Sequence, residues 1–190
     1  MNYKLILASN SPRRKELLKG LDVDFEVRII PGIDESYPEG IPSEKIPAFI
    51  AQKKADAYRA SIKDDELVIT ADTVVILDGD ILEKPVDAND AIQMIKRLSG
   101  RKHKVITSVV LTTTDRCKEF SVESTVDFAE LTNDEIEYYV DKYKPFDKAG
   151  SYGIQEWIGY IGVKGIEGSF YNVMGLPIQR LYQELKRMNR

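Results

Sequence analysis

Short apolar runs and amphipathic stretches alternate from the first residues of the chain. Residues 4–8 contain an apolar run from Leu5 that predicts a short buried strand, and the stretch from Pro12 to Gly20 is amphipathic at helical spacing. Ser11 is placed to cap this helix, and Pro12 suits its first position because the N–H that proline lacks would have no partner inside a helix. The pattern therefore predicts a strand, a tight turn and a helix in succession.

The same two periodicities recur to the end of the chain. They predict strands over residues 25–30, 67–77, 104–113 and 119–131, a hairpin at Asp78-Gly79 that leads into Ile81 and Leu82, and helices over residues 43–60, from Asp87 to Gly100, from Thr132 to Tyr143 and from Pro177 to Met188. In the helix over 43–60 the expected apolar face consists of Ile46, Phe49, Ile50 and Ala57. Glycines recur through residues 150–175, where the pattern predicts no regular element.

Strands and helices alternate without an internal repeat or a linker. The chain is therefore expected to form one α/β domain over residues 1–190, with strands long enough to make two lobes around a cleft.

The composition limits the kinds of partner that the protein is expected to bind. The chain is 43% hydrophobic and 31% charged, as in ordinary globular proteins. Its formal net charge of -4 argues against broad nucleic-acid binding, which needs a basic surface to displace counterions. No stretch approaches the roughly 18 apolar residues of a membrane span, and the N-terminus does not match a signal peptide. We therefore expect a cytoplasmic protein that binds neither nucleic acid nor membrane.

Cysteine chemistry has little support. Cys117 is the one cysteine and His103 the one histidine, so an intramolecular disulfide and a cysteine-based zinc site are excluded. Both residues lie in or beside predicted strands, which argues against a catalytic Cys/His pair.

The N-terminal turn has the features of an anion site. Arg13 and Arg14 open the first helix, where free N–H groups and the positive end of the helix dipole face the same space. A phosphate group would fit there. The alternative is a capped amphipathic helix with two solvated arginines.

A carboxylate lies inside a strand that is expected to be buried. Asp72 interrupts the apolar run of residues 67–77, which is costly unless a cation or several donors meet the charge. Lys84, just beyond the hairpin, can return to the same end of the sheet. Asp34 and Glu35, in a loop, could complete a hard-cation site with Asp72, since Mg²⁺ prefers carboxylate and phosphate oxygens. The alternative is an Asp72 satisfied by backbone N–H groups at a bulge.

Residues 150–155 form a glycine-flanked turn that can bring backbone close to a ligand. Gln155 can both donate to and accept from the edge of a base, although the segment can equally be an ordinary tight loop. Lys53 and Lys54 lie on a helix, where a lysine is usually an exposed charge. Four aromatic residues can stack on a base or pack in the core or an interface: Trp157, Tyr160, Phe170 and Tyr171.

Several cations, two or three carboxylates and no credible nucleophile suit phosphate chemistry by a positioned water and a metal ion. The residues also occur as a series of short motifs in a fixed order, Ser9-Asn-Ser-Pro-Arg-Arg14, Asp34-Glu35, Lys54-Ala55, Ala71-Asp-Thr-Val-Val75, Leu82-Glu-Lys-Pro85, Leu98-Ser-Gly100 and Gly150-Ser-Tyr-Gly-Ile-Gln155. Together they resemble the Maf family of nucleoside triphosphate pyrophosphatases from Leu5 to about Pro177.

The resemblance implies a fold shared with the inosine triphosphate pyrophosphatases. That fold is a long twisted mixed sheet with flanking helices, in two lobes around a deep cleft. It also implies hydrolysis of a nucleoside triphosphate between the α and β phosphates, a divalent cation, Mg²⁺ or Mn²⁺, as cofactor, and a homodimer as a plausible assembly.

The resemblance further implies roles for single residues. Asp72 takes the position of the catalytic proton acceptor, and Glu35 is expected to help it hold the metal. Lys54 and Lys84 match lysines of the cleft. Ser9, Arg13 and Arg14 match the phosphate-binding turn.

Three positions distinguish the branches of the family. Arg13, Thr73 and Gln155 match the branch that acts on dTTP and UTP rather than the branch that acts on 7-methyl-GTP. Glu156 and Trp157 follow the glutamine where other members often carry a small residue. Two alternatives stay open at this point: a 7-methyl-GTP pyrophosphatase, and a nucleotide-binding regulator of cell division that does not turn over its ligand.

Overall fold

The computed structural model describes residues 3–189. In that range the strands are β1 (Lys4–Leu7), β2 (Phe25–Val27), β3 (Glu66–Leu77), β4 (Asp80–Leu82), β5 (Lys102–Thr112), β6 (Cys117–Phe128) and β7 (Val163–Glu167). The α-helices are α1 (Pro12–Lys19), α2 (Ile46–Tyr58), α3 (Ala88–Leu98), α4 (Asn133–Tyr143), α5 (Trp157–Gly162), α6 (Phe170–Val173) and α7 (Ile178–Met188), with 3-10 turns η1 (Ser43–Lys45), η2 (Arg59–Ser61) and η3 (Ala149–Ser151).

The seven strands within residues 3–189 form one mixed sheet in the order β2-β1-β3-β5-β6-β7, with β4 paired to β3. The chain divides into two compact units. In the described range the first unit comprises residues 3–72, 107–122 and 175–189, and the second comprises residues 73–106 and 123–174. The α/β class and the mixed sheet with flanking helices confirm the fold class that the sequence predicts.

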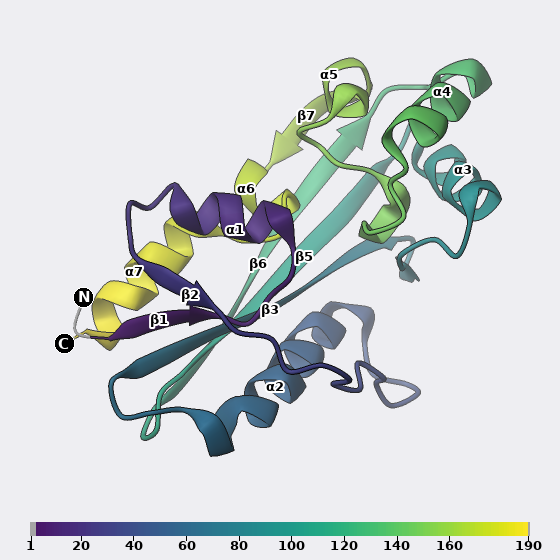
Figure 1. The fold of residues 1–190 in the computed structure, drawn as a ribbon. Helices are drawn as coiled ribbons and strands as arrows, with labels where there is room; N and C mark the ends of the chain where they lie inside the picture. The colour runs from purple at the N-terminus through teal and green to yellow at the C-terminus, as the bar shows by residue number, and fades with distance from the viewer. Residues whose placement is uncertain (1–2, 190) are drawn as a thin grey trace. The chain divides into compact units, whose positions relative to one another are not determined.

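The first unit is built on parallel strands. β1 pairs in parallel with both β2 and β3, so that Leu5 lies opposite Phe25 on one side and Leu67 on the other. A parallel strand covered on both faces needs a continuous apolar run, and residues 5–7 of β1 are fully buried. Helices α1 and α7 lie on one face of these strands and α2 on the other (Figure 1).

Helix α2 packs on the sheet through small residues and one tyrosine. Ala51 and Ala55 pack against Val110 of β5, and Tyr58 packs with Ile6 and Val68. Thr70 in β3 donates a hydrogen bond from Oγ1 to the Ala51 carbonyl oxygen at 2.9 Å. This close approach of α2 to β3 is what brings the helix's lysines near the strand.

The second unit contains antiparallel strand pairs and the helices α3, α4, α5 and α6. The β3–β4 hairpin turns through Asp78 and Gly79, which both have positive φ (55° and 91°), as the primed two-residue turns require. β7 pairs antiparallel with β6. Helices α3 and α4 lie side by side (Figure 1), and α4 begins in the capping box formed by Thr132 and Glu135.

Several element ends differ from the sequence predictions. The strand expected over 25–30 ends at Val27, and the helix expected over 43–60 is split into η1, α2 and η2. Ala57 is exposed, and the buried face of α2 instead contains Ala51 and Ala55. The glycine-rich region contains α5, β7 and α6, none of which the periodicity predicts.

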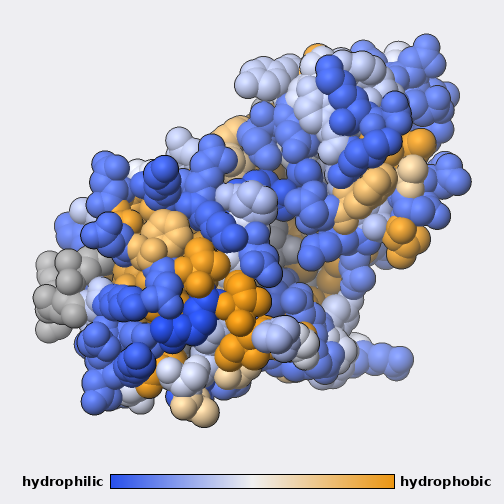
Figure 2. Space-filling view, viewed as in Figure 1, coloured by the Kyte–Doolittle hydropathy of each residue, from blue (hydrophilic) through white to orange (hydrophobic). Residues whose placement is uncertain are grey.

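The face seen in Figure 2 is largely hydrophilic; one group of hydrophobic side chains lies over β2 and the chain that follows it, and another lies near α3 and α4. Val27 and Ile29 in this region are partly exposed. No helix within residues 3–189 combines the length and the apolar character needed to cross a membrane.

Candidate functional site

The turn between β1 and α1 folds through local hydrogen bonds. Ser9 is buried, and its Oγ accepts a hydrogen bond from the Ser11 N–H at 3.2 Å. Ser11 caps α1, since its Oγ accepts from the Arg14 N–H at 3.4 Å, and Pro12 occupies the first helical position. The first turn of α1 contains no acidic residue, so the positive end of the helix dipole is not neutralised by its own side chains.

Arg14 is held against the backbone of the first unit. Its Nε donates to the Gly175 carbonyl oxygen at 2.8 Å, and its Nη1 donates to the Ala71 carbonyl oxygen at 3.0 Å. Burial lowers the pKa of Arg14, the charge of Arg13 acts in the same direction, and the charge of Asp72 opposes both. The guanidinium therefore fixes the start of α1 beside the strand residue that precedes Asp72, a role that the sequence pattern does not indicate.

Lys54 links two carboxylates. Its Nζ lies 2.9 Å from Asp72 Oδ1 and 3.0 Å from Glu35 Oε2. The side chains of Lys54 and Asp72 are each 14% exposed, whereas that of Glu35 is 53% exposed. The interpretation of Lys54 as a solvated helix lysine is therefore wrong. Among the described residues Asp72 pairs with this ammonium rather than with the N–H groups of a bulge.

The environment of Asp72 favours proton uptake more than that of a surface aspartate. Burial raises its pKa, the negative charge of Glu35 adds to this effect, and the charges of Lys54 and Arg14 oppose it. A carboxylate with a raised pKa is a stronger base, which is the property that general-base catalysis uses.

Asp34 shapes the loop instead of joining the carboxylate pair. Its oxygens accept from the Ser36 N–H at 2.9 Å, from Ser36 Oγ at 2.7 Å and from Lys53 Nζ at 2.8 Å. The hydrogen bond from Lys53 is the largest of the effects that lower the pKa of Asp34. Glu35, the next residue, is the one that meets Lys54.

The donor set fits a metal ion that keeps part of its coordination for other ligands. Within residues 3–189 no group of three or more His, Cys, Asp or Glu side chains could hold a metal ion. Glu35 and Asp72 supply carboxylates that approach the same ammonium. Mg²⁺ is commonly bound by one or two carboxylates together with phosphates and water, so this pair fits such an ion.

Arg13 is half-buried in the first turn of α1, and the remaining predicted residues lie in the second unit. Thr73 is half-buried in β3, Lys84 is exposed after β4, and Gln155 is half-buried. The Gly150 N–H donates to the Glu83 carbonyl oxygen at 3.2 Å, which joins the chain next to Lys84 to the turn that leads to Gln155.

Gln155 has a buried acceptor without a donor. In the described part of the chain its Oε1 is buried and has no hydrogen-bond partner. Such an atom is costly in a folded protein unless a ligand or water donates to it. The observation favours a binding function for residues 150–155 over an ordinary tight loop.

Three residues that sequence reasoning did not select surround this turn. Tyr139 donates from its hydroxyl to Glu156 Oε2 and accepts from the Gly153 N–H, and Lys148 Nζ lies 3.1 Å from Glu156 Oε1. Tyr139 lies in the helix that the sequence predicts from Thr132 to Tyr143, and a buried tyrosine needs a partner for its hydroxyl. That requirement is the one signal in the sequence that could have pointed to this contact.

The other candidates have structural partners of their own. His103 Nε2 lies 2.7 Å from the Tyr152 hydroxyl, and burial lowers the pKa of His103 to about 4. Cys117 Sγ lies 3.9 Å from Gln52 Oε1. Trp157 packs edge-on against Tyr138 at 4.9 Å between ring centroids, whereas Tyr160 is 84% exposed.

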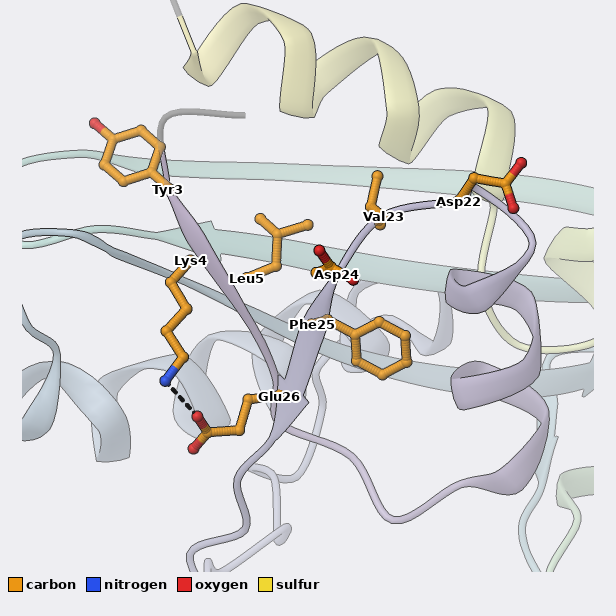
Figure 3. Close-up of a pocket in the computed structure, with 8 residues that line it drawn as sticks. All are labelled: Tyr3, Lys4, Leu5, Asp22, Val23, Asp24, Phe25 and Glu26. Carbon is orange, nitrogen blue, oxygen red and sulfur yellow. Dashed lines mark ion pairs between the residues drawn. The ribbon is translucent and has the colours of Figure 1, made fainter.

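The first unit also contains a cavity of about 530 Å³ at the start of β1 and β2. Figure 3 shows its lining and the ion pair between Lys4 and Glu26. None of the predicted site residues lines it. This cavity is therefore not the candidate site.

Comparison with known proteins identifies close relatives. The family model described as Maf-like protein matches residues 4–188. The chain is 60% identical over 186 residues to a dTTP/UTP pyrophosphatase of Phocaeicola vulgatus, covering 98% of this chain and 96% of that protein. It is 61% identical over 184 residues to a dTTP/UTP pyrophosphatase of Parabacteroides distasonis, covering 97% and 95%.

Solved structures with a similar fold are more distant in sequence. The Staphylococcus aureus Ham1 protein matches with a TM-score of 0.57 at 17% identity, covering 98% of this chain and 100% of that one. A HAM1 protein from Coxiella burnetii matches with a TM-score of 0.51 at 14% identity, covering 97% and 99%. These two likenesses concern the fold alone.

Proposed function

Because this chain belongs to the Maf family, we propose that it hydrolyses dTTP and UTP to the nucleoside monophosphate and pyrophosphate. Relatives at 60% and 61% identity over nearly their whole length bear that activity in their names. The structural observation that carries the proposal is the partly buried Asp72 carboxylate, which Lys54 links to Glu35.

Asp72 is the general base in this proposal. It orients a water molecule and accepts its proton as the water oxygen forms a bond to the α-phosphorus. The bond between that phosphorus and the oxygen bridging to the β-phosphorus breaks, and pyrophosphate leaves with the bridging oxygen. The raised pKa of Asp72 supports this role, since general-base efficiency improves as the pKa of the base approaches the working pH.

The cationic residues bind and stabilise the triphosphate. Lys54, Lys84, Arg13 and Arg14 offset the negative charge that moves onto the departing pyrophosphate. Ser9 and the start of α1 contribute polar contacts to the phosphates. Arg14 contributes its charge from a position that the carbonyl oxygens of Gly175 and Ala71 fix.

A divalent cation, Mg²⁺ or Mn²⁺, fits the donor set of Glu35 and Asp72. When bound, it supplies Lewis-acid stabilisation of phosphate oxygens. Glu35 and Asp72 hold it, and Lys54 keeps the two carboxylates near each other.

In this proposal the nucleotide base is recognised by Arg13, Thr73 and Gln155. A site that hydrogen-bonds its base rejects analogues strongly, because a wrong base leaves buried polar groups unpaired. The unpartnered Oε1 of Gln155 supports this assignment. Gln155→Ala is expected to reduce kcat/KM for dTTP and UTP far more than for purine nucleotides, and equal losses across all nucleotides would contradict the assignment.

The test of the function is pyrophosphate release from a panel of nucleotides, with and without Mg²⁺. We expect release from dTTP and UTP that depends on the cation. Release from 7-methyl-GTP instead would move the protein to the other branch of the family, and tight binding without release would indicate a nucleotide-binding regulator.

Asp72→Asn tests the mechanism within the same assay. The substitution is nearly isosteric, so we expect a folded protein in which kcat for dTTP falls by about 10²–10⁴-fold, the usual contribution of a general base. Asp80→Asn is the matched control, because Asp80 is an exposed residue in a surface ion pair with Arg97. Unchanged turnover in Asp72→Asn would refute the mechanism.

Three further points belong to this proposal. The catalytic domain extends over residues 1–190, the protein assembles as a homodimer, and it acts in the cytoplasm, where nucleoside triphosphates are made and used. Light scattering of the purified protein tests the assembly.

A further inference from the structure

Glu156 occupies an unusual position for a carboxylate at the start of a helix. It directly precedes α5, yet its side chain makes no capping hydrogen bond to that helix. Both of its oxygens turn to other partners instead. Oε2 accepts from the Tyr139 hydroxyl, and Oε1 forms an ion pair with Lys148 Nζ at 3.1 Å.

These three side chains are largely removed from solvent. Tyr139 is fully buried, the side chain of Lys148 is 9% exposed and that of Glu156 is 20% exposed. Burial raises the pKa of Tyr139, and so does the hydrogen bond to Glu156, which keeps the hydroxyl protonated as a donor. A buried ion pair with a third hydrogen-bonding partner holds a defined geometry, because each lost contact leaves a buried polar group unpaired.

The same residues hold the turn that contains Gln155. The Tyr139 hydroxyl accepts from the Gly153 N–H at 2.9 Å, and the Glu156 N–H donates to the Gly153 carbonyl oxygen at 2.9 Å. A Cβ at Gly153 would lie 2.7 Å from the Glu156 carboxyl carbon, so the glycine backbone packs directly on that carboxylate. The segment from Gly153 to Glu156, which contains Gln155, is therefore held by contacts of Tyr139 and Glu156 with Gly153.

We propose that Glu156, clamped between Tyr139 and Lys148, is a positioning residue that presents the carboxamide of Gln155 to the pyrimidine base. The inference rests on the proposed function. Gln155 Oε1 is a buried acceptor without a partner in the described chain, and the N3–H of thymine or uracil is the donor that it lacks. Glu156 does not touch the substrate; it limits the orientations that Gln155 can adopt.

Tyr139→Phe tests the clamp with the least disturbance, because it removes the hydroxyl and keeps the buried ring. We expect KM for dTTP to rise about tenfold, the effect of losing the one hydrogen bond between Gln155 and the base. We expect kcat to stay within about twofold. Tyr138→Phe is the matched control on the same helix, since the Tyr138 hydroxyl accepts a hydrogen bond from Lys142, an exposed residue. An unchanged KM in Tyr139→Phe would overturn the inference.

A double substitution separates positioning from general destabilisation. If the clamp acts through Gln155, Tyr139→Phe should change KM by less than about twofold once Gln155→Ala is also present. A merely structural loss would raise KM by the same factor in both backgrounds, and that result would also overturn the inference.

An NMR measurement tests the inference without an activity assay. The side-chain amide signal of Gln155 in a ¹H–¹⁵N spectrum is assigned by its absence in Gln155→Ala. We expect this signal to shift and broaden in Tyr139→Phe and in Glu156→Gln, and to stay in place in Tyr138→Phe. An unshifted signal in the first two variants contradicts the clamp, whereas failure of the wild-type protein to hydrolyse dTTP contradicts only the proposed function.

Discussion

Lys54 Nζ lies 2.9 Å from Asp72 Oδ1, and the same ammonium lies 3.0 Å from Glu35 Oε2. One positive charge thus holds two negative charges that would otherwise repel each other. The three side chains together carry a net charge of -1, which leaves the site attractive to a further cation. Helix α2, β3 and the loop after β2 each contribute one of the three residues.

Removing the shared cation should damage both activity and stability. In Lys54→Met the buried Asp72 carboxylate loses its partner and still faces Glu35, so we expect kcat/KM for dTTP to fall at least about a hundredfold. We also expect the free energy of unfolding to fall by roughly 1–3 kcal/mol, measured by urea denaturation.

The double variant Lys54→Met/Asp72→Asn separates these two effects. Neutralising Asp72 removes the unpaired charge, so stability should return toward that of the wild type while activity stays low. If stability remained as low as in the single variant, packing of the lysine stem rather than charge would be the cause.

The contacts of Arg14 lead to a second prediction, which concerns the stability of the fold. Its guanidinium reaches the carbonyl oxygens of Gly175 and Ala71 at once, and a lysine cannot span both with the same geometry. Arg14→Lys should lower the free energy of unfolding by about 1–3 kcal/mol. Arg97→Lys, in an exposed ion pair with Asp80, should change it by less than about 1 kcal/mol. Equal losses of unfolding free energy in the two variants would mean that the Arg14 contacts add no more stability than an exposed ion pair.

Local sequence signals predict the parts of the fold that local forces determine. Ser11 and Pro12 set the start of α1, Asp78-Gly79 sets the hairpin, and Thr132 with Glu135 sets the start of α4, each through hydrogen bonds or backbone angles within a few residues. In these places the structure confirms the prediction to within one or two residues.

Long-range packing determines what the sequence does not reveal. β7 exists because β6 offers an edge for residues 163–167, and nothing in that short glycine-containing segment predicts the pairing. Lys54 has the pattern of an exposed helix lysine, and only the close approach of α2 to β3 brings it to Asp72. The motif resemblance selects Lys54 as a site candidate where periodicity does not, and the structure places its ammonium beside Asp72 and Glu35.

The conformation of Gly150 leads to a prediction about the stability of the turn in the second unit. It has a φ of +69°, and an added Cβ would lie 3.0 Å from both γ-carbons of Val75. Gly150→Ala should therefore combine backbone strain with a steric clash and lower the free energy of unfolding by roughly 2–4 kcal/mol.

Two glycines serve as controls for the strain and the clash. Gly32 has a φ of +72° with open space around its Cβ position, so Gly32→Ala should cost only the strain, about 1–2 kcal/mol. Gly165 has open space and no positive φ, so Gly165→Ala should cost nothing measurable. Thermal unfolding of the three variants measures the order, and a Gly150→Ala protein no less stable than Gly32→Ala would exclude the clash with Val75.

The ion pair between Arg28 and Glu66 predicts how stability depends on pH. Glu66 is buried, and Arg28 Nη1 and Nη2 donate to its two carboxylate oxygens at 2.9 and 2.6 Å. The hydrogen bonds from Arg28 lower the pKa of Glu66 from 4.5 to about 2, against the opposing effect of burial. The folded state therefore binds a proton at Glu66 less readily than the unfolded state does.

The sign of the effect follows from this difference. Stabilisation by Glu66 is complete above about pH 4.5, where both states are ionised, and is lost as the pH falls toward 2, where the folded state takes up the proton. The pKa difference corresponds to roughly 3 kcal/mol as an upper estimate. Glu66→Gln should thus be less stable than the wild type at pH 7, and the gap between the two should close between pH 4.5 and pH 2. Urea denaturation of both proteins across that range measures the gap, and a constant difference would show that Glu66 contributes through packing rather than through its charge.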